Sequence, residues 1–318
     1  MVDTLGLRLF VEDAQTMNKV GSLLSGSLYV CNHDNGSEHI AGHLGCLSIT
    51  ARPHQICVTR GSLCKWYKGN NHEPMTREDI RHALESLSDV LHLPMHKADI
   101  TRLDWGACVT LDGPVSAYMK LLRHLDGYGR YAGPHSVRFD RHTSREFVGA
   151  LFYDKNRESG EGGTIPPAYV GKNVMRYELQ HKCGFRRLCR SLGYNDVRAS
   201  TLTEPAFFAA LNRHWADMYL GIFKQINTNV NDMINTGILK NVATKSELAD
   251  VAVCTLVQVV GLDTAFQLLD SRTDLTRQQR HSLKQAIKEA VKVLPILNAR
   301  DAARVSELDA KIREAAAY

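Results

Sequence analysis

Two stretches of the chain, ITRLDW at 100–105 and VMRYEL at 174–179, repeat one pattern of alternating side chains. In each stretch an arginine and a carboxylate stand two residues apart, interleaved with mostly apolar residues. Successive side chains of a β-strand point to opposite faces of a sheet. The pattern therefore predicts two strands of one sheet, with a charged pair from each strand on one face and apolar side chains on the other.

The charged pairs leave two interpretations open. If the two strands are near neighbours, Asp104 and Glu178 converge, and carboxylate oxygens are the ligands that Mg²⁺ and Mn²⁺ prefer. The simpler alternative is that Arg102 and Arg176 form ion pairs with these carboxylates on a solvated sheet face. The pattern alone favours the ion pairs and keeps the metal site as the functional hypothesis.

A third stretch, FVGALFYDK at 147–155, predicts a strand that ends beside a flexible insertion at 158–167. Tyr153 and Lys155 then share a face at the end of this strand. A tyrosine beside a lysine and a metal site suits attack on a phosphodiester, because a phenol with a pKa of about 10 needs a cation to help it ionise. The alternative is a strand-end tyrosine whose ring only packs.

The first two-thirds of the chain predicts an α+β fold with a largely antiparallel central sheet. The expected strands lie at 2–9, 44–50, 55–60, 99–109, 135–140, 146–154 and 173–181. Thr76 and Asp79 form a capping-box pattern that begins a helix at 76–92, and Pro114 begins a second helix at 114–126. Both helices are expected on one face of the sheet, which leaves the charged pairs and Tyr153 on the other, open face.

The character of the chain changes after about Asn195, where strand patterns become rare. Segments 204–226, 245–269, 276–294 and 300–317 carry helical periodicity instead. We therefore expect a boundary near 195–203. It separates an N-terminal α+β domain, 1–195, from an all-helical C-terminal domain, 196–318.

Composition narrows the class of protein. No run of 18 apolar residues occurs among the 318, so we expect no membrane-spanning helix, and the N-terminal residues do not resemble a secretory signal. The eight cysteines form no CxxC pair, which is typical of reduced thiols in a cytosol.

Residues 118–190 carry fourteen Lys and Arg against seven Asp and Glu. That surplus fits a phosphate-rich partner or, equally, a solvated basic face.

Four short segments then match one family in the correct order. The opening MVDTLGLRL at 1–9, ITRLD at 100–104, VGALFYDK at 148–155 and VMRYE at 174–178 resemble segments of filamentous-phage gene II/X replication proteins. The stretch GSLCKWYKGNN at 61–71 is similar to one common in related phage and plasmid replication proteins. The resemblance covers roughly residues 1–195 and points to the rolling-circle replication initiation proteins.

The resemblance implies a replication-initiator nuclease fold and a defined chemistry. Such proteins nick one DNA strand at an origin through a tyrosine, which stays linked to the 5′ phosphate while the free 3′ hydroxyl primes synthesis, and they later rejoin the ends. Carried over by position, Tyr153 would be the nucleophile, Asp104 and Glu178 would help bind Mg²⁺ or Mn²⁺, and Lys155 would stabilise phosphate charge or steer the phenol. The His-hydrophobic-His motif of the wider class is absent.

Arginines near the predicted strands are expected to contact DNA. Arg102 and Arg176 would hold the carboxylates or contact the DNA backbone. Further candidates for backbone contact are Arg138, Arg141, Arg145, Arg186, Arg187 and Arg190. The expected partner is single-stranded or supercoiled origin DNA in the bacterial cytoplasm, with a host helicase or polymerase as a further partner. The alternative is a DNA-binding replication regulator without catalysis.

Overall fold

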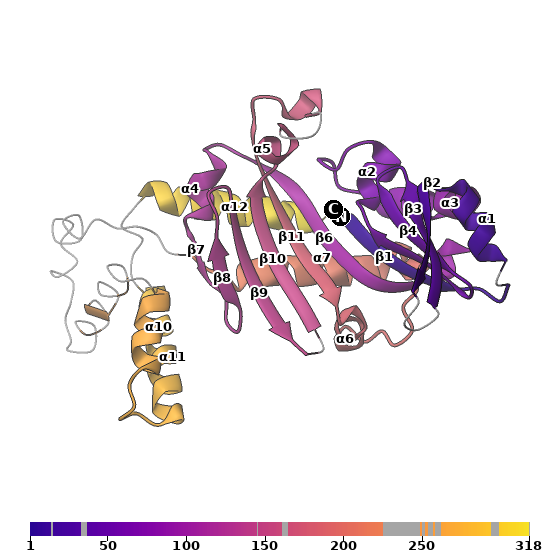
Figure 1. Cartoon of the computed structure of the whole chain (residues 1–318). Helices are drawn as coiled ribbons and strands as arrows, with labels where there is room; N and C mark the ends of the chain where they lie inside the picture. Colours follow the sequence, from indigo (N-terminus) through magenta and orange to yellow (C-terminus); the bar gives the residue numbers. More distant parts are fainter. Residues whose placement is uncertain are drawn as a thin grey trace.

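The alternating stretches lie in the middle of a ten-stranded sheet in the computed structural model of the chain (Figure 1). The structure describes residues 1–13, 15–32, 37–144, 146–160, 165–224, 249, 252–253, 257, 262–293 and 299–317. The strand order is β2-β3-β4-β5-β1-β6-β11-β10-β9-β8, and every neighbouring pair is antiparallel. The predicted α+β class with a largely antiparallel sheet is confirmed.

The strands of this sheet have the following bounds: β1 Val2–Phe10, β2 Ser25–Asn32, β3 Ser37–Leu44, β4 Leu47–Arg52, β5 Gln55–Arg60, β6 Asp99–Leu111, β8 Gly129–Ala132, β9 Ser136–Thr143, β10 Glu146–Asp154 and β11 Asn173–Cys183. A separate two-stranded ladder joins β7 Leu122–His124 to β12 Phe223–Lys224. The helices are α1 Thr16–Leu23, α2 Leu63–Lys68, α3 Arg77–Leu91, α4 Val115–Met119, α5 Lys155–Gly160, α6 Phe185–Ser191, α7 Pro205–Leu220, α10 Leu262–Asp270, α11 Arg277–Val293 and α12 Ala299–Ala316.

The sequence signals for α3 act as expected. The Thr76 hydroxyl accepts a hydrogen bond from the Asp79 amide, and the Asp79 carboxylate accepts one from the Thr76 amide. This capping box satisfies two amides that the first turn leaves without helical partners. The apolar stripe of the helix, Ile80, Ala83, Leu84, Leu87 and Leu91, is buried.

The prediction of a second helix at 114–126 is wrong in its second half. The helix α4 ends at Met119, and the chain then extends as β7, whose Leu122 pairs with Lys224 of β12. Leu122 and Leu125 are both buried in the extended segment, so the helical spacing came from side chains that enter the core for another reason. The edge strand β8 follows at Gly129–Ala132 and was not among the predicted strands.

The aromatic core on one face of the sheet is covered by α7 and α12. The ring of Trp215 on α7 stacks on Tyr177 of β11 at 4.7 Å between centroids, and Tyr177 stacks on Phe152 of β10 at 4.4 Å. Leu308 and Ile312 of α12 belong to the same buried cluster. Figure 1 shows both helices running behind the central strands. This face is the predicted apolar face.

The region after residue 195 is mostly helical in the part that the structure describes, but it is not purely helical, because β12 lies within it. Most of the predicted helix 245–269 lies outside the described residues, and α10 covers its end. The boundary near 195 stays a prediction. Against that boundary stands the shared core, since α7 and α12 bury their side chains with those of β6, β10 and β11. No helix in the described ranges is long and apolar enough to cross a membrane.

Candidate active site

Register places the charged residues on the face of the sheet opposite α7. Across β6, β11 and β10, Cys108, Arg176 and Tyr153 form one row, and Gly106, Glu178 and Leu151 form the next. Neighbouring rows on one face lie two residues apart along each strand. Tyr153 and Glu178 are therefore diagonal neighbours on adjacent strands, within reach of each other.

Tyr153 is bound to the carboxylate. Its hydroxyl donates a hydrogen bond of 2.8 Å to Oε1 of Glu178. Burial, followed by the negative charge of Glu178, raises the pKa of Tyr153 well above its usual range. Burial also raises the pKa of Glu178, in spite of a neighbouring guanidinium. The phenol is thus neutral at rest, and the group placed to accept its proton is a carboxylate more basic than usual.

The guanidinium beside Glu178 belongs to Arg176, whose side chain is 3% exposed. Its Nε donates to Oε1 of Glu178 at 2.7 Å, and its Nη2 lies 3.2 Å from Oδ2 of Asp3 on β1. Its Nη1 donates to the backbone carbonyl of Asn71. An arginine held on three sides fixes the direction in which Glu178 presents its oxygens.

Asp3 was not among the residues predicted from the sequence. Its Oδ1 accepts hydrogen bonds from the Ser62 hydroxyl and, at 3.2 Å, from the Asn71 side chain. Burial tends to raise the pKa of Asp3, but Arg176 and these two hydrogen bonds outweigh it and hold the pKa below its usual range. The sequence signal that could have pointed to Asp3 is the resemblance of segments 1–9 and 61–71 to replication proteins. That resemblance assigns no role to single residues.

Ser62 also explains why the segment 61–71 takes this shape. Its hydroxyl accepts a hydrogen bond from the Lys65 amide and so caps α2, while it donates to Asp3. The preceding Gly61 has φ of 107°, and a Cβ there would lie 2.3 Å from the Cys46 carbonyl oxygen. Only glycine fits that approach, so the turn that brings Ser62 to Asp3 depends on it.

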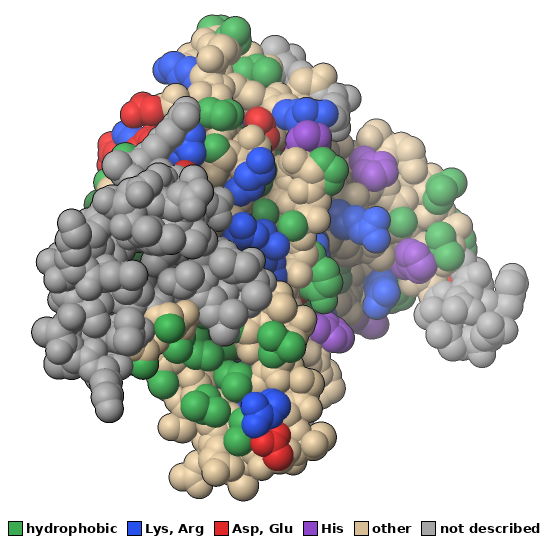
Figure 2. Space-filling view, turned by 90° about the vertical axis from the view of Figure 1, so that its left-hand side faces the viewer, with side chains coloured by type: hydrophobic (Ala, Val, Ile, Leu, Met, Phe, Trp, Pro, Cys, Tyr) green, Lys and Arg blue, Asp and Glu red, His purple; other side chains and the backbone are tan. Residues whose placement is uncertain are grey.

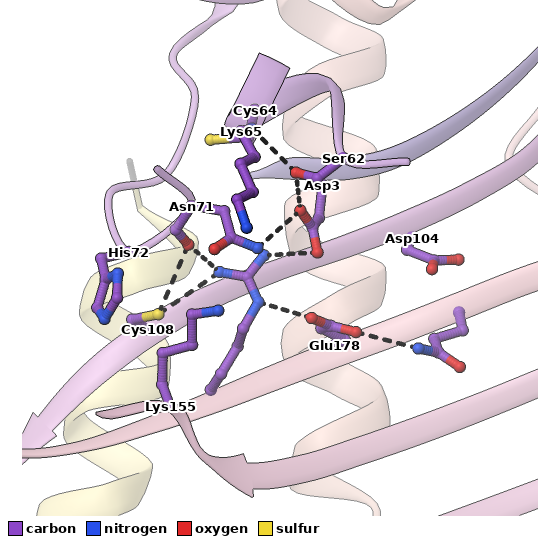
Figure 3. A network of polar contacts seen from close by, with 12 residues as sticks. Asp3, Ser62, Cys64, Lys65, Asn71, His72, Asp104, Cys108, Lys155 and Glu178 are labelled. Carbon is purple, nitrogen blue, oxygen red and sulfur yellow. Dashed lines mark hydrogen bonds and ion pairs between the residues drawn. The ribbon is translucent and has the colours of Figure 1, made fainter. Parts of the chain in front are cut away.

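Asp104 shares the face but not the cluster, as Figure 3 shows. Its oxygens accept two hydrogen bonds from Arg102, one of them at 3.0 Å, and the side chain is 2% exposed. Its partner across β11 is Gln180, which donates at 3.0 Å to Oε2 of Glu178. Both arginine–carboxylate pairs of the simpler alternative are therefore present, but the expected solvated face is wrong, because the side chains of Asp104, Arg176 and Glu178 are buried.

The residues present do not fit a ready divalent-cation site. Within the described residues no group of three or more His, Cys, Asp and Glu side chains is arranged to hold a metal ion. Both oxygens of Asp104 and of Glu178 already accept hydrogen bonds from nitrogen or from Tyr153. A cation at either carboxylate would have to displace one of these donors.

Lys155 is not on the strand with Tyr153 as predicted, because β10 ends at Asp154 and Lys155 begins α5. Its side chain is 2% exposed, and Nζ donates to Oε2 of Glu158 at 2.6 Å. The same nitrogen lies 5.9 Å from the centroid of the Tyr153 ring. The lysine thus adds positive charge beside the ring, while the hydroxyl faces Glu178.

A cavity of about 350 Å³ opens at the tyrosine. Tyr153 and Glu178 line it together with His135, Ser136 and Arg157, which come from the start of β9 and from α5. Its size is in the range that small ligands occupy. The hydroxyl and its proton acceptor therefore border a space in which a phosphodiester fits.

The predicted DNA-contacting arginines are spread over both faces. Arg138 lies opposite Leu151 on the tyrosine face and donates to Asp140 at 2.6 Å. Arg141 pairs with Glu146 at 3.1 Å and lies opposite Val148, a residue of the apolar face. On α6, Arg186 bonds Asp99, Arg187 approaches Glu146, and Arg190 donates to the Arg186 carbonyl; Arg145 lies outside the described residues.

One further cation on the tyrosine face was missed. Lys182 of β11 places Nζ 4.6 Å from the centroid of the Phe147 ring. Burial, and then the nearby charges of Arg138 and Arg102, lower the pKa of Lys182. Its position two residues beyond Gln180 would have put it on this face by alternation. Figure 2 shows Lys and Arg side chains gathered across the middle of the molecule on the side that it presents.

Comparisons with known proteins give one family. A search of curated proteins finds no match to the chain. Among solved structures, the di-domain ARO/CYC protein BexL from the BE-7585A biosynthetic pathway is 9% identical, with 69% of this chain and 96% of that chain covered. Its TM-score is 0.20, so this likeness carries no argument. The family model for the N-terminal region of the phage replication-associated protein of gene II matches residues 1–188, and the chain therefore belongs to this family of phage replication initiation proteins.

Proposed function

We propose that the chain is a rolling-circle replication initiator that nicks one strand of origin DNA through Tyr153. The observation that carries the proposal is the hydrogen bond of the Tyr153 hydroxyl to Glu178, whose direction is fixed by Arg176 and Asp3. Membership of a phage replication family supplies the context of origin DNA. The antiparallel sheet, whose aromatic face is covered by α7 and α12, supports this proposal of an initiator-nuclease fold, although α5 and the segment that leads into α2 also lie on the tyrosine face.

The chemistry follows from this contact. The Tyr153 oxygen attacks the phosphorus while its proton passes to Glu178, so a bond from the phenol oxygen to phosphorus forms and the bond from phosphorus to the 3′ oxygen breaks. The 3′ oxygen leaves as a hydroxyl after taking a proton from water, and Glu178 gives its proton back to the hydroxide that remains, so the net transfer is one proton from the phenol to the 3′ oxygen. Attack of a 3′ hydroxyl on the phosphotyrosine reverses these steps and rejoins the ends. The positive charge of Arg176 favours the ionised phenol, and Lys155, which is paired with Glu158, would add positive charge beside the ring.

A requirement for Mg²⁺ or Mn²⁺ remains part of the proposal, with Asp104 and Glu178 as the residues expected to respond to the cation. Because their oxygens are engaged by arginine, glutamine and tyrosine, no step above is assigned to the metal. Nicking assays at increasing cation concentration, with and without EDTA, test this part separately. Full activity in EDTA would contradict it and leave the role of Tyr153 intact.

Origin DNA, single-stranded or supercoiled, is the expected substrate in the cytoplasm of the bacterial host. Arg157 lines the cavity, and Arg138 and Lys182 lie on the same face of the sheet as Tyr153, so these three cations are placed to contact a strand that enters the cavity. A host helicase or polymerase would act on the nicked product. These partners are proposals that rest on the nicking reaction.

A regulator that binds DNA without cutting it is the second candidate. One observation favours it: Asp3 and Glu178 both form ion pairs with the buried Arg176, as they would in a purely structural cluster. In that case Tyr153 would form no covalent bond. The same experiment separates the two candidates.

The test uses labelled single-stranded DNA tiled across the cognate replicon, with Mn²⁺ or Mg²⁺, and measures a protein–DNA adduct that resists SDS. We expect an adduct that is lost in Tyr153→Phe. The matched control is Tyr131→Phe on the edge strand β8, where the ring is 61% exposed, and it should form the adduct as the unchanged protein does. An adduct that persists in Tyr153→Phe would move the nucleophile, and no adduct with folded, DNA-bound protein would favour the regulator.

A further inference from the structure

A second cavity lies on the opposite face of the sheet from Tyr153. Its volume is about 480 Å³, and it is bounded by the ends of β9, β10 and β11 and by α6 and α7. Val148 of β10 and His181 of β11 pair across the sheet and both point into this side, where His214 of α7 meets them. The cavity is therefore separate from the candidate active site.

Buried polar atoms without partners surround this space. His181 is 3% exposed, and neither of its ring nitrogens has a hydrogen-bond partner in the described part of the chain. Nε2 of His214 and Nε of Arg141 are also buried and unpartnered among those residues. Buried polar groups in proteins are nearly always hydrogen-bonded, because an unpaired one costs about 1–3 kcal/mol. Four such atoms around one cavity indicate that a polar molecule completes it.

The charges at the rim specify an anionic group. Arg141 and Arg187, with side chains 42% and 57% exposed, both approach the Glu146 carboxylate, at 3.1 Å and 3.9 Å. Two guanidiniums thus share one carboxylate and leave one positive charge unmatched. The Ser191 hydroxyl lines the same cavity. One phosphate would balance the charge and accept hydrogen bonds from the arginines.

The floor of the cavity suits a flat, mostly apolar ring. Val148 and Leu188 supply apolar surface, and the Tyr128 ring forms one wall. Burial lowers the pKa of His181 to about 3, so at neutral pH each imidazole offers one donor and one acceptor. An aromatic heterocycle with donors and acceptors at its edge matches this lining, as a phosphate matches the rim.

We propose that this cavity binds one deoxynucleotide unit, with the base against His181 and His214 and the phosphate at Arg141 and Arg187. Such a unit can be a free deoxynucleoside monophosphate or an unpaired nucleotide of a DNA strand. The volume is in the range of about 300–1,000 Å³ that small-ligand sites occupy. The proposal does not depend on nicking at Tyr153.

The test is a calorimetric titration of the full chain with each of the four deoxynucleoside 5′-monophosphates. We expect saturable binding of at least one of them, weakened about tenfold by Arg187→Gln through loss of a charged contact. The matched control is Arg213→Gln, because Arg213 is exposed on α7 beside His214 and does not line the cavity, and the affinity of this variant should stay within about twofold of that of the unchanged protein.

A second variant separates a ligand site from a structural void. His181→Phe removes two unpartnered buried nitrogens, so the variant should fold and be at least as stable as the unchanged protein. If the cavity binds nucleotides, binding is lost in this stable variant. Binding that survives His181→Phe and Arg187→Gln alike would overturn the proposal.

Two further experiments, with inorganic phosphate and with an oligonucleotide, identify the ligand. Inorganic phosphate that binds as tightly as every nucleotide would show a simple anion site and contradict the role of the base. An oligonucleotide that competes with the monophosphate, but not when the nucleotide at one position is abasic, would identify the source as an unpaired base in a strand. Binding of the monophosphate without such competition would identify the free nucleotide. No binding of any probe at millimolar concentration would reject the proposal.

Discussion

Arg176 is the residue on which the candidate site depends. It is buried between carboxylates from two distant parts of the chain, Asp3 on β1 and Glu178 on β11. A buried ion pair adds little stability over an apolar equivalent, yet loss of one partner is costly because the other charge stays buried. The cluster is thus better explained by the geometry that it imposes on Glu178 than by the stability that it adds.

Replacement of Asp3 by asparagine tests that geometry. Asp3→Asn keeps the shape of the side chain but removes the negative charge beside Arg176, so we expect a loss of about 2 kcal/mol in the free energy of unfolding. Adduct formation should slow while DNA affinity is unchanged, because Asp3 contacts Arg176 and not the cavity. The control is Asp13→Asn, whose partner Lys19 is exposed, and it should be nearly neutral. An unchanged adduct rate in Asp3→Asn would remove Asp3 from the site.

His181 predicts a dependence of stability on pH. Burial, then repulsion by His214 and Arg141, lowers the pKa of His181 to about 3, while the unfolded residue titrates near 6.5. Glu146 and Arg187 are the other charged groups at the same cavity. Below about pH 6.5 the unfolded chain binds a proton that the folded chain does not. The free energy of unfolding therefore decreases by up to about 1.4 kcal/mol for each unit by which the pH is lowered.

The measurement is the free energy of unfolding by urea at pH 7 and pH 5.5. In His181→Phe the loss between these two values should be smaller than in the unchanged protein by about 1 kcal/mol. Equal losses in the two proteins would show that His181 is not buried in the neutral form.

Among the elements, α7 has the largest share of the aromatic core. Trp215 is fully buried and stacks on Tyr177, and Trp105 of β6 donates to Asn212 of the same helix at 3.0 Å. We expect Trp215→Ala to lower the free energy of unfolding by about 3–5 kcal/mol, since it leaves a large cavity under the sheet. Leu220→Ala, at the exposed end of α7, should cost about 1 kcal/mol or less. Similar urea midpoints for the two variants would contradict the packing of α7 on the sheet through Trp215.

The elements show which parts of the structure a sequence can predict. The strands β6, β10 and β11 were predicted because each buries one face against helices, which produces a period of two. Strands β2 and β3 were missed, since their exposed residues, such as Leu28 and Tyr29, break the alternation of inward and outward side chains. The two-residue strand β12 is defined only by its tertiary pairing with β7.

The candidate site also has features that the sequence could predict and features that it could not. Alternation along β6 and β11 correctly predicted that Asp104 and Glu178 share a face, because that depends on local geometry alone. The contact of Asp3 with Arg176 could not be predicted, because it requires β1 to lie beside β6 and the 61–71 segment to fold over it. The cavity at His181 depends likewise on the docking of α6 and α7.

At the scale of the molecule, one core joins both ends of the described chain. Residues from Met1 to Ile312 belong to a single buried cluster that includes α7 and α12. A chain that ends at residue 195 would expose Trp105, Phe152 and Tyr177 to water, a cost of several kcal/mol. We expect this fragment to lose its near-ultraviolet dichroism and to bind hydrophobic dyes, measured beside the full chain. A fragment that unfolds cooperatively would instead establish the boundary predicted near residue 195.

The sheet order also has a consequence for synthesis on the ribosome. The central strand β6 pairs with β11, which follows about sixty residues later in the chain. At about 5–20 residues per second, β6 waits about 3–12 s for its neighbour, and its helical cover arrives later still with α7 and α12. During that interval an apolar strand edge is open to other nascent chains. The residues that form the site are thus translated early and assembled late, so we expect the yield of active protein to depend on translation speed and on host chaperones.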